Sequence, residues 1–134
     1  MNATCFFTEL KHSDICLIAK EIGYTYHIIS GEDTWDKIKL SNDKGGFLIN
    51  SLHVRKPGSE LSRLILGTHN YVRYREIDNE IKIKIMKIIE NCVMSVGFVF
   101  DNRYEGVYLD VVFELMSHFN CVVFDGEDFY YNEK

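Results

Sequence analysis

The feature that most constrains the fold is the alternation of short β-branched and aromatic segments with longer segments that are apolar at helical spacing. The first kind predicts strands and the second amphipathic helices. We expect strands at residues 4–9, 24–30, 34–40, 47–54, 93–100, 121–124 and 129–131. We expect helices to begin at Ser13, Ser59 and Asp78, which are good N-caps, and after residues 101–104. This order predicts an α/β or α+β fold, with a mixed β-sheet packed with about four helices.

Residues 78–92 fit two patterns. Glu80 to Ile85 alternates between polar and apolar residues like a half-exposed strand. Over a longer window the apolar residues recur at helical spacing, at Ile77, Ile81, Ile85, Ile88 and Cys92. The length of the segment favours a helix with Asp78 as its cap, although a strand stays open at this point.

Composition indicates one domain covering residues 1–134. Hydrophobic residues make up 46% and charged residues 26%, with one proline and no linker-like stretch. Residues 1–10 lack the pattern of a signal peptide, and no apolar run approaches the length of a membrane span. We therefore expect a cytoplasmic protein that does not bind membranes. In that reducing compartment its cysteines should be free thiols: Cys5, Cys16, Cys92 and Cys121.

The absence of catalytic motifs favours a binding protein over an enzyme. No phosphate-binding loop, nucleophile elbow or HExxH pair is present. The five histidines are isolated from one another in sequence, so we expect neither a metal nor another cofactor. One alternative is a small metal-dependent nuclease, in which Asp78 and Glu80 hold Mg²⁺ and Lys82 stabilises charge. A helix over these residues would remove the strand geometry that such a site needs.

Charge is distributed unevenly along the chain. Residues 1–100 contain 12 acidic and 13 basic side chains, whereas residues 101–134 contain 8 acidic and 2 basic ones. An acidic surface with aromatic anchors repels nucleic acid and attracts basic proteins, although the same charge can simply keep a small protein in solution. The residues that we expect to contact a partner are Asp101, Glu105, Tyr108, Asp110, Glu114, Asp125, Glu127, Asp128 and Tyr130.

The last third of the chain resembles a poorly characterised bacterial domain family. In that family a D-x-R-[YF] turn opens a helix, which leads to an apolar strand ending in F-D-G and to a short aromatic segment. The matching features here are Asp101-Asn102-Arg103-Tyr104, the helix after it, Phe124-Asp125-Gly126 and Phe129. Such small acidic α/β proteins are similar to immunity proteins, made beside secreted toxins to protect the producer.

The resemblance implies a protein that binds and neutralises a cognate, basic protein toxin, and it implies no catalytic residues. A third reading is a structural or regulatory domain that associates with itself through exposed strand edges. The sequence leaves the oligomeric state open.

Overall fold

A single antiparallel sheet organises the molecule. The computed structural model describes residues 2–99 and 105–132. Its strands are β1 (Asn2–Phe7), β2 (Thr25–Ser30), β3 (Lys37–Asn42), β4 (Gly45–Leu52), β5 (Met94–Val99), β6 (Cys121–Phe124) and β7 (Phe129–Asn132). They lie in the order β2-β3-β4-β5-β1-β6-β7. The helices are α1 (His12–Glu21), α2 (Glu60–Arg73), α3 (Asn79–Glu90) and α4 (Glu105–His118).

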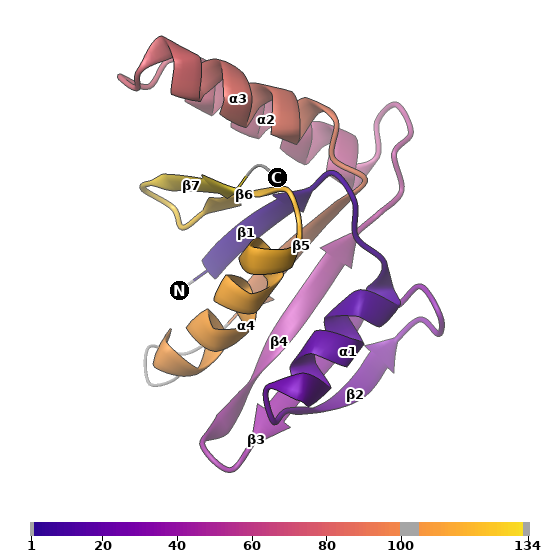
Figure 1. Ribbon diagram of the computed structural model, residues 1–134. Helices are drawn as coiled ribbons and strands as arrows, with labels where there is room; N and C mark the ends of the chain where they lie inside the picture. The colour runs from indigo at the N-terminus through magenta and orange to yellow at the C-terminus, as the bar shows by residue number, and fades with distance from the viewer. Residues whose placement is uncertain (1, 100–104, 133–134) are drawn as a thin grey trace.

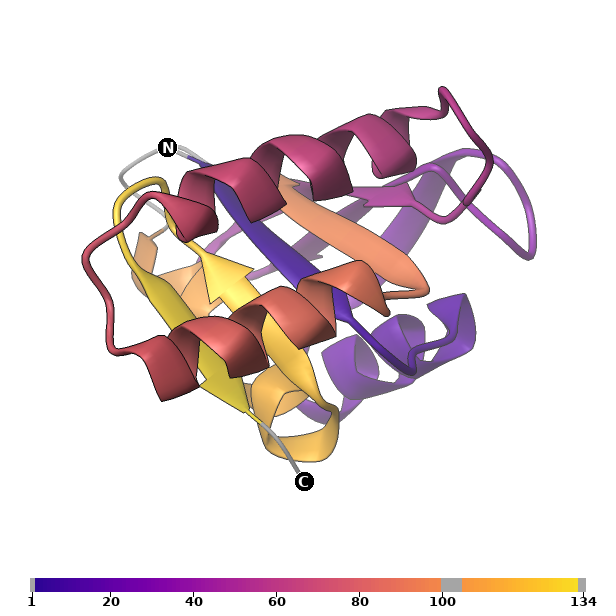
Figure 2. The ribbon, with the colours of Figure 1, turned by 90° about the horizontal axis from the view of Figure 1, so that it is seen from above.

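Helices cover both faces of this sheet (Figure 1). On one face α1 and α4 enclose the larger core, into which β1 contributes Ala3, Cys5 and Phe7. On the other face α2 and α3 enclose a smaller core with Phe6 and Val122. Figure 2 shows α2 and α3 side by side across the sheet, with β1 between them in the view. The alternation of β1 side chains between the two cores is the period of two that a strand covered on both faces requires.

The predicted class is confirmed, because the fold is α+β with four helices in the described part of the chain. The sheet is antiparallel at every described pairing, so the expectation of a mixed sheet was wrong in this detail. The reason lies in the connections. The α2–α3 hairpin crosses the sheet twice, so β5 begins at the end where β4 stops and runs antiparallel to it.

The two other helical connections join strands that run in the same direction but are not neighbours. The α1 connection leads from β1 to β2 and passes β5, β4 and β3, whereas the α4 connection leads from β5 to β6 and passes β1. They start on strands of opposite direction and move toward opposite edges. A half-turn about the sheet normal therefore relates them, so crossovers of the same hand place α1 and α4 on one face.

Helix starts agree with the sequence at two of the three predicted caps. The Ser59 hydroxyl accepts a hydrogen bond from the Ser62 amide at 3.2 Å, and the Asp78 carboxylate accepts one from the Glu80 amide at 2.9 Å. Residues 79–90 are therefore helical, as the longer apolar period predicts. The cap at Ser13 was wrong: the cap position lies two residues earlier, at Lys11, and α1 begins at His12. The Asp14 carboxylate accepts from the Lys11 amide at 2.9 Å and thereby satisfies this helix end.

Candidate functional site

The outer face of α4 carries part of the acidic set that the sequence singles out. This helix buries Val111, Val112 and Leu115 against the larger core. Helical spacing therefore turns residues 110, 113, 114 and 117 outward. Asp110 is exposed, and the half-exposed Glu114 carboxylate lies 3.6 Å from His118 Nε2. The structure thus places both predicted carboxylates of α4 at the surface.

Phe113 lies on the same outward side of α4 as these two carboxylates and was missed by the sequence analysis. Its side chain is 61% exposed, although α4 offers an apolar core on its inner face. The signal was present in the helical period, because residue 113 lies three positions after Asp110 and one before Glu114. An exposed aromatic side chain flanked by acids has the composition of an interface anchor.

The β6–β7 turn holds the other predicted acids. The Asp125 carboxylate accepts hydrogen bonds from the Glu127 amide at 2.9 Å and the Asp128 amide at 2.8 Å. Partial burial raises its pKa, but these bonds outweigh burial, so the pKa lies below its ordinary value. Asp125 therefore holds the turn together. Tyr130 is half exposed beside it, and the Asp125 charge raises the pKa of the Tyr130 phenol.

Arg75 binds this turn from the α2–α3 connection. Its guanidinium donates a hydrogen bond to the Glu127 carbonyl and lies 3.8 Å from the Asp128 carboxylate.

Asp110, by contrast, lies on the α1 side of the molecule, close enough to Tyr24 to affect it. Burial raises the pKa of the Tyr24 phenol, and the Asp110 charge raises that pKa further. The acids therefore form two groups, of which the turn group is partly compensated. Asp101 falls outside the described residues, as do the side chains of Glu105 and Tyr108.

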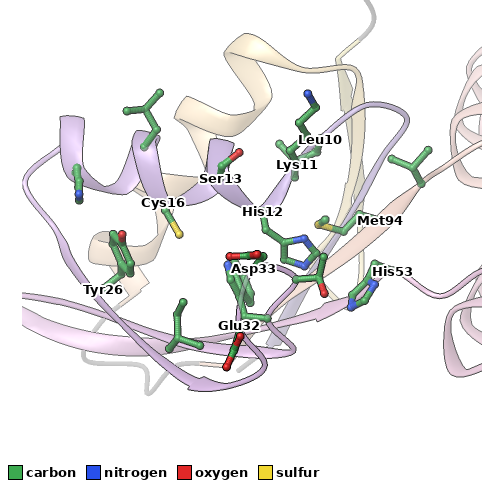
Figure 3. Close-up of a pocket in the computed structure, with 16 residues that line it drawn as sticks. Leu10, Lys11, His12, Ser13, Cys16, Tyr26, Glu32, Asp33, His53 and Met94 are labelled. Carbon is green, nitrogen blue, oxygen red and sulfur yellow. The ribbon is translucent and has the colours of Figure 1, made fainter.

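A second feature is an open depression of about 760 Å³ between α1, β2 and the β2–β3 loop (Figure 3). His12 reaches its floor and is 7% exposed. Its Nε2 lies 3.0 Å from the Ser51 hydroxyl, which donates a 2.6 Å hydrogen bond to the Trp35 carbonyl. The His53 ring meets the His12 ring edge-on at 5.0 Å and lies 3.4 Å from the Asp36 carboxylate.

This histidine cluster joins α1 to the β2–β3 loop and β4 and is not arranged for nucleophilic catalysis. Ser51 is buried and its proton is directed to a backbone carbonyl, so His12 Nε2 is the donor in their bond. Burial is the main cause that lowers the pKa of His12, and the nearby His53 lowers it further. Neutral His12 is thus a structural partner of Ser51.

The cysteines give no activated thiolate among the described side chains. All four are free, as predicted. Burial raises the pKa of Cys92 and of Cys121 to about 11, and it raises that of Cys5 well above its ordinary value. Half-buried Cys16 lines the depression; burial raises its pKa too, against the opposing effects of the Trp35 indole and Lys20. A nucleophilic cysteine needs the opposite shift.

Helix α3 does not provide the strand geometry that the nuclease alternative requires. Asp78 is occupied as the helix cap, and the Lys82 ammonium donates to the Arg73 carbonyl at 3.1 Å. Within residues 2–99 and 105–132, no three His, Cys, Asp or Glu side chains are grouped so that they could hold a metal ion. What α3 presents at these positions is a capped helix start packed against the end of α2.

Comparison with known proteins identifies no relative. No protein-family model, no curated protein and no solved structure matches the chain. In the part of the chain that the structure describes, no helix has both the length and the apolar character to span a membrane.

Proposed function

We propose that this chain is an immunity-type protein that binds a basic protein toxin and neutralises it through the outer face of α4. The observation that carries the proposal is the 61% exposure of Phe113 beside Asp110 and Glu114. The Phe113 side chain is largely exposed to water, and its full burial in an interface would stabilise a complex by about 1.5–3 kcal/mol. Carboxylates beside it would steer a cationic partner and exclude an anionic one.

The division of the acids supports α4 as the contact. Asp125 is used by its own turn, and Arg75 compensates part of the charge near Asp128. Asp110 has no basic side chain within 4 Å among the described residues, and Glu114 has only His118. The carboxylates on α4 therefore keep more of their field available to a partner than the carboxylates in the turn. Glu127 and Tyr130 stay in the proposal as rim residues, because both are exposed.

The experiment begins with the gene beside this one. If that gene encodes a secreted protein with a toxic C-terminal domain, co-expression of the chain should restore growth. The purified pair should form a complex measurable by titration calorimetry. Phe113→Ala should weaken binding by about 30-fold, the size of an interface hot spot. Asp110→Lys with Glu114→Lys should slow association by about tenfold at low salt and reverse its salt dependence.

A matched control reverses the same amount of charge elsewhere. Glu60 and Glu90 are exposed and lie at the end of the α2–α3 layer away from Arg75 and the β6–β7 turn. Glu60→Lys with Glu90→Lys should leave the association rate within about twofold, since charges beyond the Debye length of about 8 Å are screened. Equal effects of the two double variants would show that only net charge matters. Unchanged affinity in Phe113→Ala would remove α4 from the proposal.

A further inference from the structure

The α2–α3 layer covers only part of the second face of the sheet and reaches as far as Leu52 at the end of β4. The α2–α3 layer packs on β1 and β6, where Phe6 and Val122 are buried under it. Beyond β1 the same face continues over β5, β4, β3 and β2. Cross-strand register gives two rows on this open face. The first is His27, Lys39, Leu48 and Val99, and the second is Lys37, Asn50, Gly97 and Thr4.

Gly97 lies in the middle of the second row, and no feature of the fold requires a glycine there. β5 is a central strand, and its register with both neighbours is continuous through residue 97. Gly97 is not among the glycines with positive φ, and a Cβ atom built on it would meet only the Asn50 carbonyl, at 3.9 Å. Glycine weakens a strand interior, and it often marks a bulge, a bend or a close approach of another molecule to the backbone; the continuous register excludes a bulge here.

The space above Gly97 is a groove of about 590 Å³. Its floor is formed by Gly97, Asn50 and Thr4, and α2 forms one wall with Glu60 and Leu64. The opposite side opens onto the first row, where Leu48 and Val99 are 36% and 43% exposed. The groove therefore combines a polar floor that offers hydrogen bonds with an apolar margin.

Two lysines, unpaired among the described residues, lie on the β3 side of this face. Lys37 and Lys39 are exposed on β3, and His27 is exposed beside Lys39 on β2. Among the described side chains neither lysine has a carboxylate within 4 Å. Two carboxylates line the groove. Asp36 lies 3.4 Å from His53, and Glu60 is in the first turn of α2, where the helix dipole favours a negative charge.

We propose that this groove, with the row of Lys39 and Leu48 beside it, is a second interaction surface that takes an acidic segment of a partner protein. The segment would pass over Gly97, bond to Asn50 and Thr4, and place its carboxylates against Lys37 and Lys39. This surface is on the opposite side of the sheet from α4 and does not depend on the toxin-binding proposal.

Two other occupants fit less well. A second copy placed face to face with its two-fold axis over β3 would bring Lys37 and Lys39 close to their own equivalents, and like charges in an interface are unfavourable. Single-stranded nucleic acid binds through stacked aromatic side chains. The aromatic residues that continue the second row beyond Thr4 are Phe124 and Phe129, and they already stack on each other at 4.5 Å beside Tyr71 of α2. Both occupants are outcomes that the test separates.

The test uses the full ¹⁵N-labelled chain and three probes: a short peptide of alternating Leu and Glu, its Leu–Lys counterpart, and a single-stranded oligodeoxynucleotide. The Leu–Glu peptide should shift the amide signals of Asn50 and Gly97 in a saturable way, and the other two probes should not. Lys37→Glu with Lys39→Glu should weaken that binding by at least about tenfold. Gly97→Val should abolish it while the fold persists, because valine suits a strand and its Cβ has room.

Controls separate a blocked groove from general effects. Gly67 is an exposed glycine of α2 whose Cβ would meet nothing within 4 Å, so Gly67→Ala should leave binding unchanged. Lys84→Glu with Lys87→Glu removes equal charge from exposed positions of α3 and should change affinity by less than about twofold. Full binding by Gly97→Val would falsify the proposal. So would equal binding of the Leu–Lys peptide or the oligonucleotide, or self-association that Gly97→Val abolishes. Phe113→Ala should leave the peptide affinity unchanged, so the two proposals fail separately.

Discussion

Removal of the Ser51 hydroxyl tests whether the histidine cluster holds the α1 side of the molecule together. Ser51 is 3% exposed, and its oxygen lies 3.0 Å from His12 Nε2 and 2.6 Å from the Trp35 carbonyl oxygen. Ser51→Ala leaves a buried imidazole N–H and a backbone carbonyl without this partner. Alanine fits the site because it only removes an atom, so the loss should be electrostatic and not steric.

The magnitude follows from the two groups that lose their partner. A buried polar group left without a hydrogen bond costs about 1–3 kcal/mol. Two such groups with partial relaxation give about 2–4 kcal/mol. For a chain of this size each kcal/mol lowers Tm by about 3 °C, so Ser51→Ala should lower Tm by about 6–12 °C.

The assay is thermal and urea unfolding followed by circular dichroism, with Ser13→Ala as the control. Ser13 is exposed and is not the cap of α1, so its variant should stay within about 0.5 kcal/mol of the parent protein. In the double variant His12→Leu with Ser51→Ala, the imidazole N–H that Ser51→Ala would leave without a partner is itself removed. The loss of unfolding free energy in the double variant should therefore be smaller, by about 1 kcal/mol, than the sum of the losses in the two single variants. A Tm within 2 °C of the parent for Ser51→Ala, about 0.7 kcal/mol, would refute the role assigned to the cluster.

Three further predictions rest on single positions. Burial lowers the pKa of His12 in the folded state, so folding favours its neutral form. The free energy of unfolding, measured with urea, should therefore fall as pH falls below the ordinary histidine pKa of 6.5. The same decrease should be less steep in His12→Phe. In the native protein Cys16 should react first with a thiol reagent, because it is half-buried whereas the other three cysteines are buried, and equal reactivity of all four would contradict this. Gly31→Ala should destabilise by more than about 1 kcal/mol in the same unfolding assay, because φ is 84° and a Cβ would lie 2.7 Å from the Trp35 Cα.

Local elements were predictable because their causes are local. Asp78 caps the amide of Glu80, and the apolar period of the following residues matches one helix face, so residues 79–90 are helical despite their strand-like start. Strand direction was not predictable in the same way. It depends on whether α2 and α3 form a hairpin or two separate crossovers, and that choice is made by long-range packing of both helices on Phe6 and Val122.

The candidate sites divide along the same line. The outward position of Asp110, and of Phe113 with it, follows from helical period alone, although the sequence analysis used only the acids. His12 and Ser51 are 39 residues apart and meet only because α1 crosses the sheet to β2. Arg75 likewise reaches the Glu127 carbonyl from 52 residues away. Counting the charges of residues 101–134 could not reveal that Arg75, from the α2–α3 connection, lies against the acidic β6–β7 turn.

The separation of charge by layer bears on both proposals together. A net charge of −5 suggests a uniformly acidic surface, yet Lys37 and Lys39 face one side of the sheet, and Asp110 lies with α4 on the other. The sheet and a helix layer stand between the two sets. At physiological ionic strength, charges on one side are screened from the other within about 8 Å. A basic partner on α4 and an acidic segment over Gly97 would therefore occupy the molecule at the same time, and each affinity should be independent of the other unless binding reshapes the sheet that they share.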